Sequence, residues 1–242
     1  MYFYFLIRIK EDFKMDNSKL SELFINALVL FTALPVHECA HAWTAHKMGD
    51  DTAKEQGRIT LNPFKHLSLW GSLMMVLIGF GWGKPVNVNP DNFKNPKKGM
   101  VLTSLAGPAS NFIMALLAMI CCRVCYMIAA VDAMTSSLGT SKDIFFTISD
   151  VFLYVTLINI SLGVFNFLPI PPLDGSKIFN AVLPEKIYFT IMKYEQFIFI
   201  ALIVLMYSGL LDKPLAILQN TVISVMLFLT GWVDNLMAAI LL

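Results

Sequence analysis

Three side chains that could bind a metal ion and activate water stand together early in this sequence. They are His37, Glu38 and His41, in the order His-Glu-x-x-His. Residues four apart on a helix lie about 40° apart around its axis, so His37 and His41 can both reach one ion. Glu38, next to the first histidine, can contact a water molecule at that ion. This is the spacing that a zinc-dependent hydrolase needs.

The motif lies inside an apolar segment, residues 20–45, and not in a polar one. A charged side chain at membrane depth costs roughly 2.5–3.5 kcal/mol on insertion scales and usually serves a function. Chance matches to the motif mostly lie on solvated helices, so we favour the metal interpretation. His46 projects from the opposite side of such a helix and Cys39 points away from His37. Neither joins the predicted ligands.

The composition is that of a membrane protein. Of 242 residues, 57% are hydrophobic and 14% are charged, whereas soluble domains carry about 25% charged residues. The net charge of +1 gives no indication of nucleic-acid binding. The four cysteines lie in apolar segments, and their spacing predicts neither a disulfide framework nor a cysteine zinc site. They are Cys39, Cys121, Cys122 and Cys125.

The apolar segments predict an all-α polytopic membrane protein with five to six transmembrane helices. The longer ones are residues 20–45, 100–130, 151–167, 197–211 and 215–236. The apolar stretch 67–80 is short for a span, which takes about 20 residues, so it favours a membrane-dipping element. Val86 and Val88 alternate with asparagines, which suggests a short strand or β-hairpin. The polar, Ser/Thr-rich residues 132–149 predict a loop.

One domain is expected over residues 20–242, preceded by an N-terminal tail over residues 1–19, with Met15 as an alternative start. Lysines flank the short apolar stretch 67–80 on both sides. Because Lys and Arg concentrate in cytosolic loops, both ends of this stretch are expected to face the cytosol.

A catalytic zinc ion takes three protein ligands and keeps one position open, so a third ligand is needed. Asp174 is the leading candidate because it follows an apolar span in LPIPPLDG, where prolines break the helix. The same pattern also fits a plain Asp-Gly turn at the membrane surface, and the residues alone leave both interpretations open. Asn111 and Asn166 are candidates for substrate binding. Such side chains on membrane helices often only bond a neighbouring helix.

Taken together, HECAH, GPASN and NFLPIPPLDG resemble the motifs of the site-2 protease family of intramembrane zinc metalloproteases, in the family's order. The resemblance covers about residues 20–240. TLNPFKH and GWGKPVNVNP are similar to segments of short bacterial members, although LSLWG follows His66 where those members often have an acidic residue and a proline. The chain shows neither the PDZ nor the CBS domain that some members carry.

The resemblance implies Zn²⁺ as cofactor, with His37, His41 and Asp174 as ligands and Glu38 as the catalytic residue. It implies that Asn111 lies close to the site. The expected activity is cleavage of a peptide bond within or near a substrate's transmembrane helix, by a multi-pass protein in the plasma membrane of a prokaryote. The alternatives are an inactive relative that acts as a binding scaffold and a metal-ion transporter, which should show inverted repeats.

Overall fold

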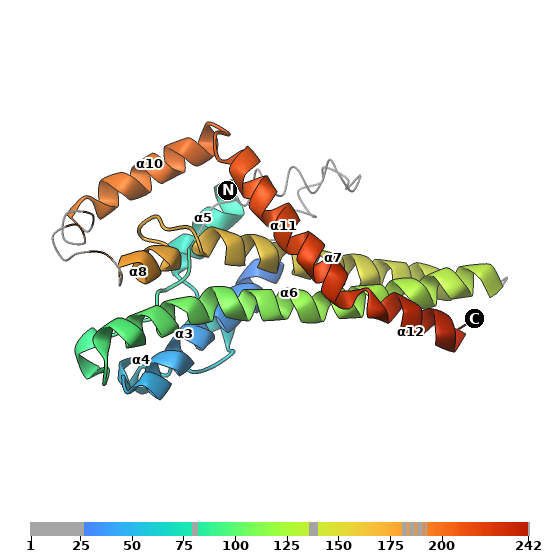
Figure 1. The fold of residues 1–242 in the computed structure, drawn as a ribbon, viewed down its shortest axis with the longest axis horizontal. Coiled ribbons are helices and arrows are strands. Elements are labelled where there is room, and N and C mark those ends of the chain that lie inside the picture. The colour runs from blue at the N-terminus through green and yellow to red at the C-terminus, as the bar shows by residue number, and fades with distance from the viewer. Residues whose placement is uncertain are drawn as a thin grey trace.

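The computed structural model describes residues 27–78, 82–135, 140–180, 183, 187, 191 and 193–241. This part of the chain is helical and holds no β-strand; one isolated antiparallel bridge pairs Leu67 with Gly83. The long helices α6 (Pro96–Thr135) and α7 (Thr140–Asn166) pack side by side, and α3 (Leu34–Met48) packs against α6 (Figure 1). The predicted all-α class is confirmed for the described residues.

The remaining elements surround this pair of long helices. Helices α11 and α12 pack against α6, and α11 also contacts α7, while α10 extends to one side of the bundle (Figure 1). Of the shorter helices, α8 packs against α6 and α4 packs against α3. The bounds are α4 (Thr52–Glu55), α5 (Leu69–Ile78), α8 (Asp174–Asn180), α10 (Glu195–Tyr207), α11 (Asp212–Thr230) and α12 (Trp232–Leu241), with 3₁₀ turns at Pro63–Lys65 and Pro90–Asn92.

Three helices among the described residues are long and apolar enough to cross a membrane. They cover Pro96–Asp132, Ile144–Asn166 and Asp212–Leu236, and the apolar helix Glu195–Tyr207 is shorter. Large apolar side chains stand exposed on them, as lipid-facing residues do; Phe228 is 84% exposed. The predicted span 20–45 begins outside the described residues, and the whole tail 1–19 lies outside them. The count of five to six spans therefore stays a prediction.

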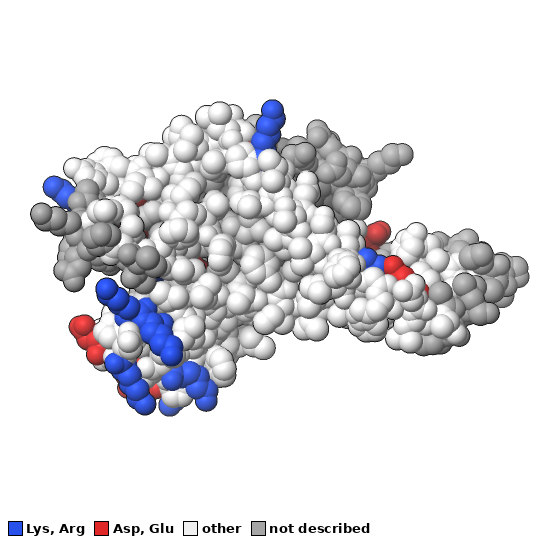
Figure 2. All heavy atoms as spheres, in the orientation of Figure 1, with Lys and Arg blue, Asp and Glu red and all other residues white. Residues whose placement is uncertain are grey.

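Charged side chains are unevenly distributed over the surface. In the view of Figure 2, Lys and Arg gather at the end formed by α4 and the start of α6, while the face beside it is largely uncharged. A charged end and an apolar body are what a membrane protein requires. The exposed lysines between residues 47 and 98 are Lys47, Lys54, Lys65, Lys84, Lys94, Lys97 and Lys98.

The predicted loop over residues 132–149 is wrong over most of its length. Helix α6 continues to Thr135 and α7 begins at Thr140. Apolar side chains within the Ser/Thr-rich stretch pack on the neighbouring helix: the rings of Phe146 and Tyr126 lie 5.7 Å apart, edge to face. Packing between two long helices thus outweighs the weak helix preference of Ser and Thr.

The apolar stretch 67–80 contains α5 (Leu69–Ile78), and the described chain that resumes at Trp82 lies beside the start of this stretch. The bridge between Leu67 and Gly83 is supported by the Lys84 N–H, which donates to the His66 carbonyl at 2.7 Å. A Cβ atom on Gly71 would lie 1.9 Å from the carbonyl oxygen of Trp82, so only glycine fits there. Leu67 and Gly83, before and after α5, therefore lie together. Its position in a membrane stays a prediction.

The predicted β-hairpin is not formed within the described residues. The segment 84–89 is extended, but it is bonded by side chains of the first third of the chain and pairs with no strand there. Pro85 and Pro90 contribute to this, since a proline has no N–H for a ladder. A single extended segment with alternating Val86 and Val88 remains.

A π-helical turn, Val29–Ala33, precedes α3, and Pro35 stands in the first turn of α3. Proline has no N–H to donate and its ring clashes with the carbonyl four residues earlier, so a wider turn relieves the crowding. The helix continues past it and carries His37 and His41 on one buried face. Gly49, with φ of 113°, ends the helix in the left-handed conformation.

Candidate metal centre

His37 and His41 lie one helical turn apart on α3 and turn their rings towards each other. Their Nε2 atoms are 3.0 Å apart, and the two ring planes meet at 85°. Both side chains are buried, at 4% and 7% exposure. Two imidazole nitrogens converge on one point, as the i, i+4 spacing predicts.

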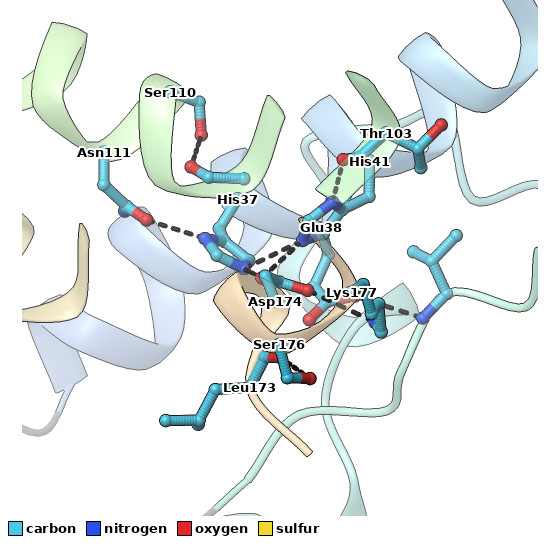
Figure 3. A network of polar contacts seen from close by, with 12 residues as sticks. His37, Glu38, His41, Thr103, Ser110, Asn111, Leu173, Asp174, Ser176 and Lys177 are labelled. Carbon is cyan, nitrogen blue, oxygen red and sulfur yellow. Dashed lines mark hydrogen bonds and ion pairs between the residues drawn. The ribbon is translucent and has the colours of Figure 1, made fainter. Parts of the chain in front are cut away.

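Asp174 brings a carboxylate to the same point from α8. Its Oδ2 atom lies 3.1 Å from the Nε2 atom of His37 and 3.0 Å from that of His41 (Figure 3). One ligand atom from each of the three residues can be chosen so that all lie within 4.8 Å of one another. Two nitrogens and one oxygen form a donor set that suits Zn²⁺ and leaves a position open for a reactant.

The chain reaches this position because the helix breaks after Asn166. Residues 167–173, which include three prolines, form a compact turn, and α8 starts at Asp174. A Cβ atom on Gly175 would lie 2.2 Å from the carbonyl oxygen of Phe167, so the turn closes only over a glycine. Between the two interpretations that the residues left open, the geometry favours the ligand, because Asp174 is 8% exposed and faces the histidines.

Each histidine is oriented by an acceptor at its other ring nitrogen. The Nδ1–H of His37 donates to Oδ1 of Asn111 at 2.6 Å, and the Nδ1–H of His41 donates to the carbonyl of Thr103 at 2.7 Å. Asn111 in turn donates to Oδ1 of Asn159 at 2.9 Å, which fixes its amide orientation. Both Nε2 atoms therefore keep a free lone pair towards the predicted metal.

Helix α6 approaches the histidines closely at one residue, Gly107. A Cβ atom there would lie 2.4 Å from the Nε2 atom of His41 and 2.5 Å from Cε1 of His37. No side chain other than hydrogen fits without displacing an imidazole. The GPASN sequence thus supplies a contact surface in Gly107 and, one turn later, the acceptor Asn111.

Glu38 lies beside the three predicted ligands and lines the same cavity. Its Oε2 atom accepts the backbone N–H of Val86 at 3.2 Å and lies 3.9 Å from Nη2 of Arg58. Nζ of Lys177 donates to Oδ1 of Asp174 at 3.3 Å (Figure 3). A carboxylate next to the open metal position is suited to accept a proton from water.

The cavity that holds these groups has a volume of about 430 Å³. Apart from the predicted ligands, Glu38, Asn166 and Lys177, its walls are mainly apolar, so it suits a hydrophobic peptide. The extended segment 84–89 forms one wall. The larger apolar side chains that line it are Leu34, Trp82, Val86, Val88, Met100, Leu162, Phe165, Leu173 and Phe199.

Residues 25–207 match the profile of peptidase family M50. The chain belongs to this family. The matched region includes the His-Glu-x-x-His motif and Asp174. The predicted resemblance to site-2 proteases is thereby confirmed. A Zn²⁺ cofactor agrees with both the family and the donor set.

Relatives of this M50 chain are bacterial proteins with metalloprotease names. "Putative zinc metalloprotease YwhC" of Bacillus subtilis is 41% identical over 188 residues, which cover 78% of this chain and 81% of the relative. Proteins named Rip2 from Mycolicibacterium smegmatis and Mycobacterium tuberculosis are 28% and 27% identical, over 75% and 74% of this chain and 66% and 65% of theirs. No solved structure matches the chain with significance.

The two predicted substrate-binding asparagines occupy different positions in this M50 fold. Asn166 lines the cavity, whereas Asn111 is fully buried behind His37 and is not among the lining residues. The position of Asn111 favours an orienting role, and substrate contact by Asn166 stays a prediction. His46 pairs with Asp51 away from the cluster, and the buried His66 bonds the carbonyl of Thr60 at 2.8 Å.

Sequence reasoning missed three contributors to the site. Gly107 and the Thr103 carbonyl lie on α6, where only the tertiary packing shows that they meet the histidines. Arg58 stands in a polar, turn-rich stretch that looks solvated, yet it is 3% exposed. The one available signal was the glycine that precedes Pro108 in a long helix, since a glycine inside a helix often marks a close approach.

Proposed function

We propose that this chain is a zinc-dependent intramembrane endopeptidase that cleaves a peptide bond within or near the transmembrane segment of a membrane protein. The observation that carries the proposal is the convergence of His37, His41 and Asp174 beside Glu38, in a mainly apolar cavity. A zinc ion bound there would act as a Lewis acid on the scissile carbonyl and lower the pKa of water. The bacterial relatives support a location in a prokaryotic plasma membrane.

Glu38 is the general base in this proposal. Its carboxylate accepts the proton of the attacking water and passes it to the leaving amine nitrogen, so one side chain performs both proton transfers. Asn111 and Thr103 keep the two imidazoles in the tautomer that presents Nε2. The surrounding apolar walls reduce the access of bulk water, which strengthens the electrostatic contacts inside.

The extended segment 84–89 is the proposed docking edge for substrate. A helical substrate hides its peptide bonds within its own turns and must unwind locally to be cut. An unwound segment could add to residues 84–89 as a further strand, with main-chain bonds for affinity and the Val86 and Val88 surfaces for side-chain fit. No strand among the described residues already pairs with this edge.

The test is a cleavage assay on purified full-length protein in detergent, with transmembrane peptides, with and without a chelator. Cleavage that stops on chelation and returns with zinc supports the proposal. Glu38→Gln should lower the rate about 10²–10⁴-fold while zinc content and fold persist. Glu55→Gln, an exposed glutamate on α4, removes the same charge away from the site and should leave the rate unchanged.

An inactive scaffold would bind a transmembrane peptide but never cleave it, even with one zinc per chain. Cleavage by Glu38→Gln at the wild-type rate would contradict the assignment of the base. A metal-ion transporter would move zinc across vesicles without any proteolysis. The three function classes thus give separate results in one set of experiments.

A further inference from the structure

Arg58 is a buried charge that makes no contact with the three predicted metal ligands. It follows the turn after α4 and is 3% exposed. Its Nη1 donates to the carbonyl of Lys65 at 2.8 Å, and its Nη2 donates to the carbonyl of Lys84. The same Nη2 atom lies 3.9 Å from Oε2 of Glu38. One guanidinium thus meets three separate parts of the chain.

An arginine is suited to this position and a lysine is not. The planar guanidinium directs several N–H groups in fixed directions, so two carbonyls on different segments can be bonded at once. A lysine ammonium keeps the charge but lacks this fixed fork. Burying a charge is costly unless it is bonded and paired, so a solvated surface arginine would be the default in such a polar stretch.

The contacts of Arg58 determine where the cavity wall lies. The extended segment is anchored at Lys84 by Arg58 and at its other end by Asp50, which accepts the Asn89 N–H at 2.8 Å. Between these anchors the Val86 N–H reaches Glu38 at 3.2 Å. The proposed general base Glu38 and the proposed docking edge 84–89 are therefore fixed relative to each other, and Arg58 contacts both.

We propose that Arg58 is a positioning residue that fixes the Glu38 carboxylate and the extended segment 84–89 relative to each other. The inference rests on the proposed function, in which Glu38 is the base and residues 84–89 receive substrate. Arg58 acts through Glu38 and the wall, because it is not itself a lining residue of the cavity and bonds none of the predicted metal ligands. Its removal should then affect both substrate affinity and the chemical step.

Asp50 provides the matched comparison. It is also fully buried and also anchors the extended segment, but its bonds go to Asn89, Asn92 and Thr52 and not to Glu38. Loosening the wall at Asp50 should weaken substrate binding and leave the base in place. A difference between the two variants therefore separates positioning of Glu38 from a general loosening of the fold.

The experiment compares wild type, Arg58→Gln, Arg58→Lys and Asp50→Asn as full-length protein, on one transmembrane peptide that wild type cleaves in a chelator-sensitive way. We expect Arg58→Gln to lower kcat about 10–100-fold, the range for loss of an orienting partner, and to raise KM. Arg58→Lys should have a kcat between those of Arg58→Gln and wild type, but its KM should stay raised. Asp50→Asn should raise KM and leave kcat at the wild-type value. Zinc content should stay at the wild-type level in all variants.

Hydrogen–deuterium exchange over residues 84–89 gives a readout besides activity. Exchange should rise in Arg58→Gln, in Arg58→Lys and in Asp50→Asn, because each loses an anchor of the segment. If Arg58→Gln does not fold, Arg58→Lys carries both measurements. If wild type cleaves no peptide, the proposed function fails, and the exchange measurement alone decides whether Arg58 holds the segment.

Two results would overturn the inference. In the first, Arg58→Gln raises KM as Asp50→Asn does and leaves kcat unchanged. Arg58 would then hold only the segment 84–89 and would not position Glu38. In the second, the Arg58 variants match wild type in exchange and in kinetics. Either result can arise while wild type remains an active, chelator-sensitive protease, so failure of this inference is distinct from failure of the proposed function.

Discussion

The Nδ1 atom of His37 lies 2.6 Å from the Oδ1 atom of Asn111, although the two residues stand 74 positions apart in the chain. This bond joins α3 to α6 directly behind the metal centre. It selects the tautomer in which His37 presents a free Nε2 lone pair. A residue that sequence motifs place near the site thus has a specific structural role.

Asn111→Ala should weaken zinc binding about 10–100-fold, the usual cost of removing an orienting partner of a metal-binding histidine. Zinc affinity, measured by competition with a chelator, checks this. Asn166→Ala is the control, because Asn166 lines the cavity and makes no contact with either histidine; it should bind zinc as wild type does. Normal affinity in Asn111→Ala would show that His37 needs no such support.

His37→Ala and Asp174→Ala should each lose zinc more severely than Asn111→Ala, by over about 100-fold in affinity, since a ligand contributes more than its partner. Zinc per chain, determined by elemental analysis after dialysis, is the measurement. His46→Ala removes a histidine that pairs with Asp51 outside the cluster and should keep full occupancy. Full occupancy in Asp174→Ala would refute the third ligand.

Gly107→Ala should displace the imidazoles of His37 and His41, because the added methyl group would lie 2.4–2.5 Å from ring atoms. We expect reduced zinc affinity together with a lower Tm. Gly231→Ala is the matched control, since a Cβ atom there would meet its nearest neighbour at 3.5 Å, an ordinary contact. Unchanged zinc binding in Gly107→Ala would mean that α6 can move away at little cost.

The folded protein should lose stability in acid because of the Asp50 carboxyl. Burial raises the pKa of its carboxyl, but hydrogen bonds from Thr52, Asn92 and the Asn89 N–H outweigh this and hold the pKa below its ordinary value. The folded state then binds the proton less readily than the unfolded state. The resulting stabilisation is complete above about pH 3.9 and is lost as the pH falls through the lowered folded value.

The measurement is Tm against pH for wild type and Asp50→Asn in detergent. The variant should melt lower at about pH 7, and the difference should shrink as the pH falls below about 3.9. Asp91→Asn changes an exposed aspartate near the same segment and should melt like wild type throughout. A difference that stays constant down to the lowest pH would contradict the assignment.

Residues 54 and 94 flank the α5 stretch, and both lysines are exposed. If the stretch dips into the membrane and returns, single cysteines at Lys54 and Lys94 should both resist an impermeant thiol reagent applied to intact cells. Both should react once the cells are permeabilised. The background must lack Cys39, Cys121, Cys122 and Cys125. Labelling of the two positions from opposite sides would show that the stretch crosses.

The half of the candidate metal site on α3 could be predicted because it is local. One helical turn separates His37 from His41, so spacing alone determines that their side chains converge. Asp174 lies 137 positions from His37, and its contact depends on the proline-rich turn and on α6 approaching through Gly107. A single sequence gives no measure of such packing, which is why the residues left Asp174 open until the motifs were considered together.

The wrong loop prediction and the missed burial of Arg58 have the same cause, since a single sequence does not show tertiary packing. The Ser/Thr-rich residues 140–149 looked like a loop because their composition is polar, but Phe146 packs on Tyr126 of α6 and Ser149 bonds the Cys122 carbonyl of the same helix. Arg58 looked solvated because its neighbours are polar. It is buried where three distant parts of the chain meet, with bonds to the carbonyls of Lys65 and Lys84 and an ion pair with Glu38. In both cases, residues distant in the sequence determined the environment.

The pairing of Leu67 with Gly83 gives this family member a closed excursion from its catalytic framework. Helix α5 lies between those two paired residues, whereas residues 84–89 are bonded by Arg58 and Asp50, so a change in the length of α5 removes none of the bonds that hold residues 84–89. The entropy of closing such an excursion changes only slowly with its length. The length of this stretch can thus change at little entropic cost without a change in the arrangement of the predicted metal ligands.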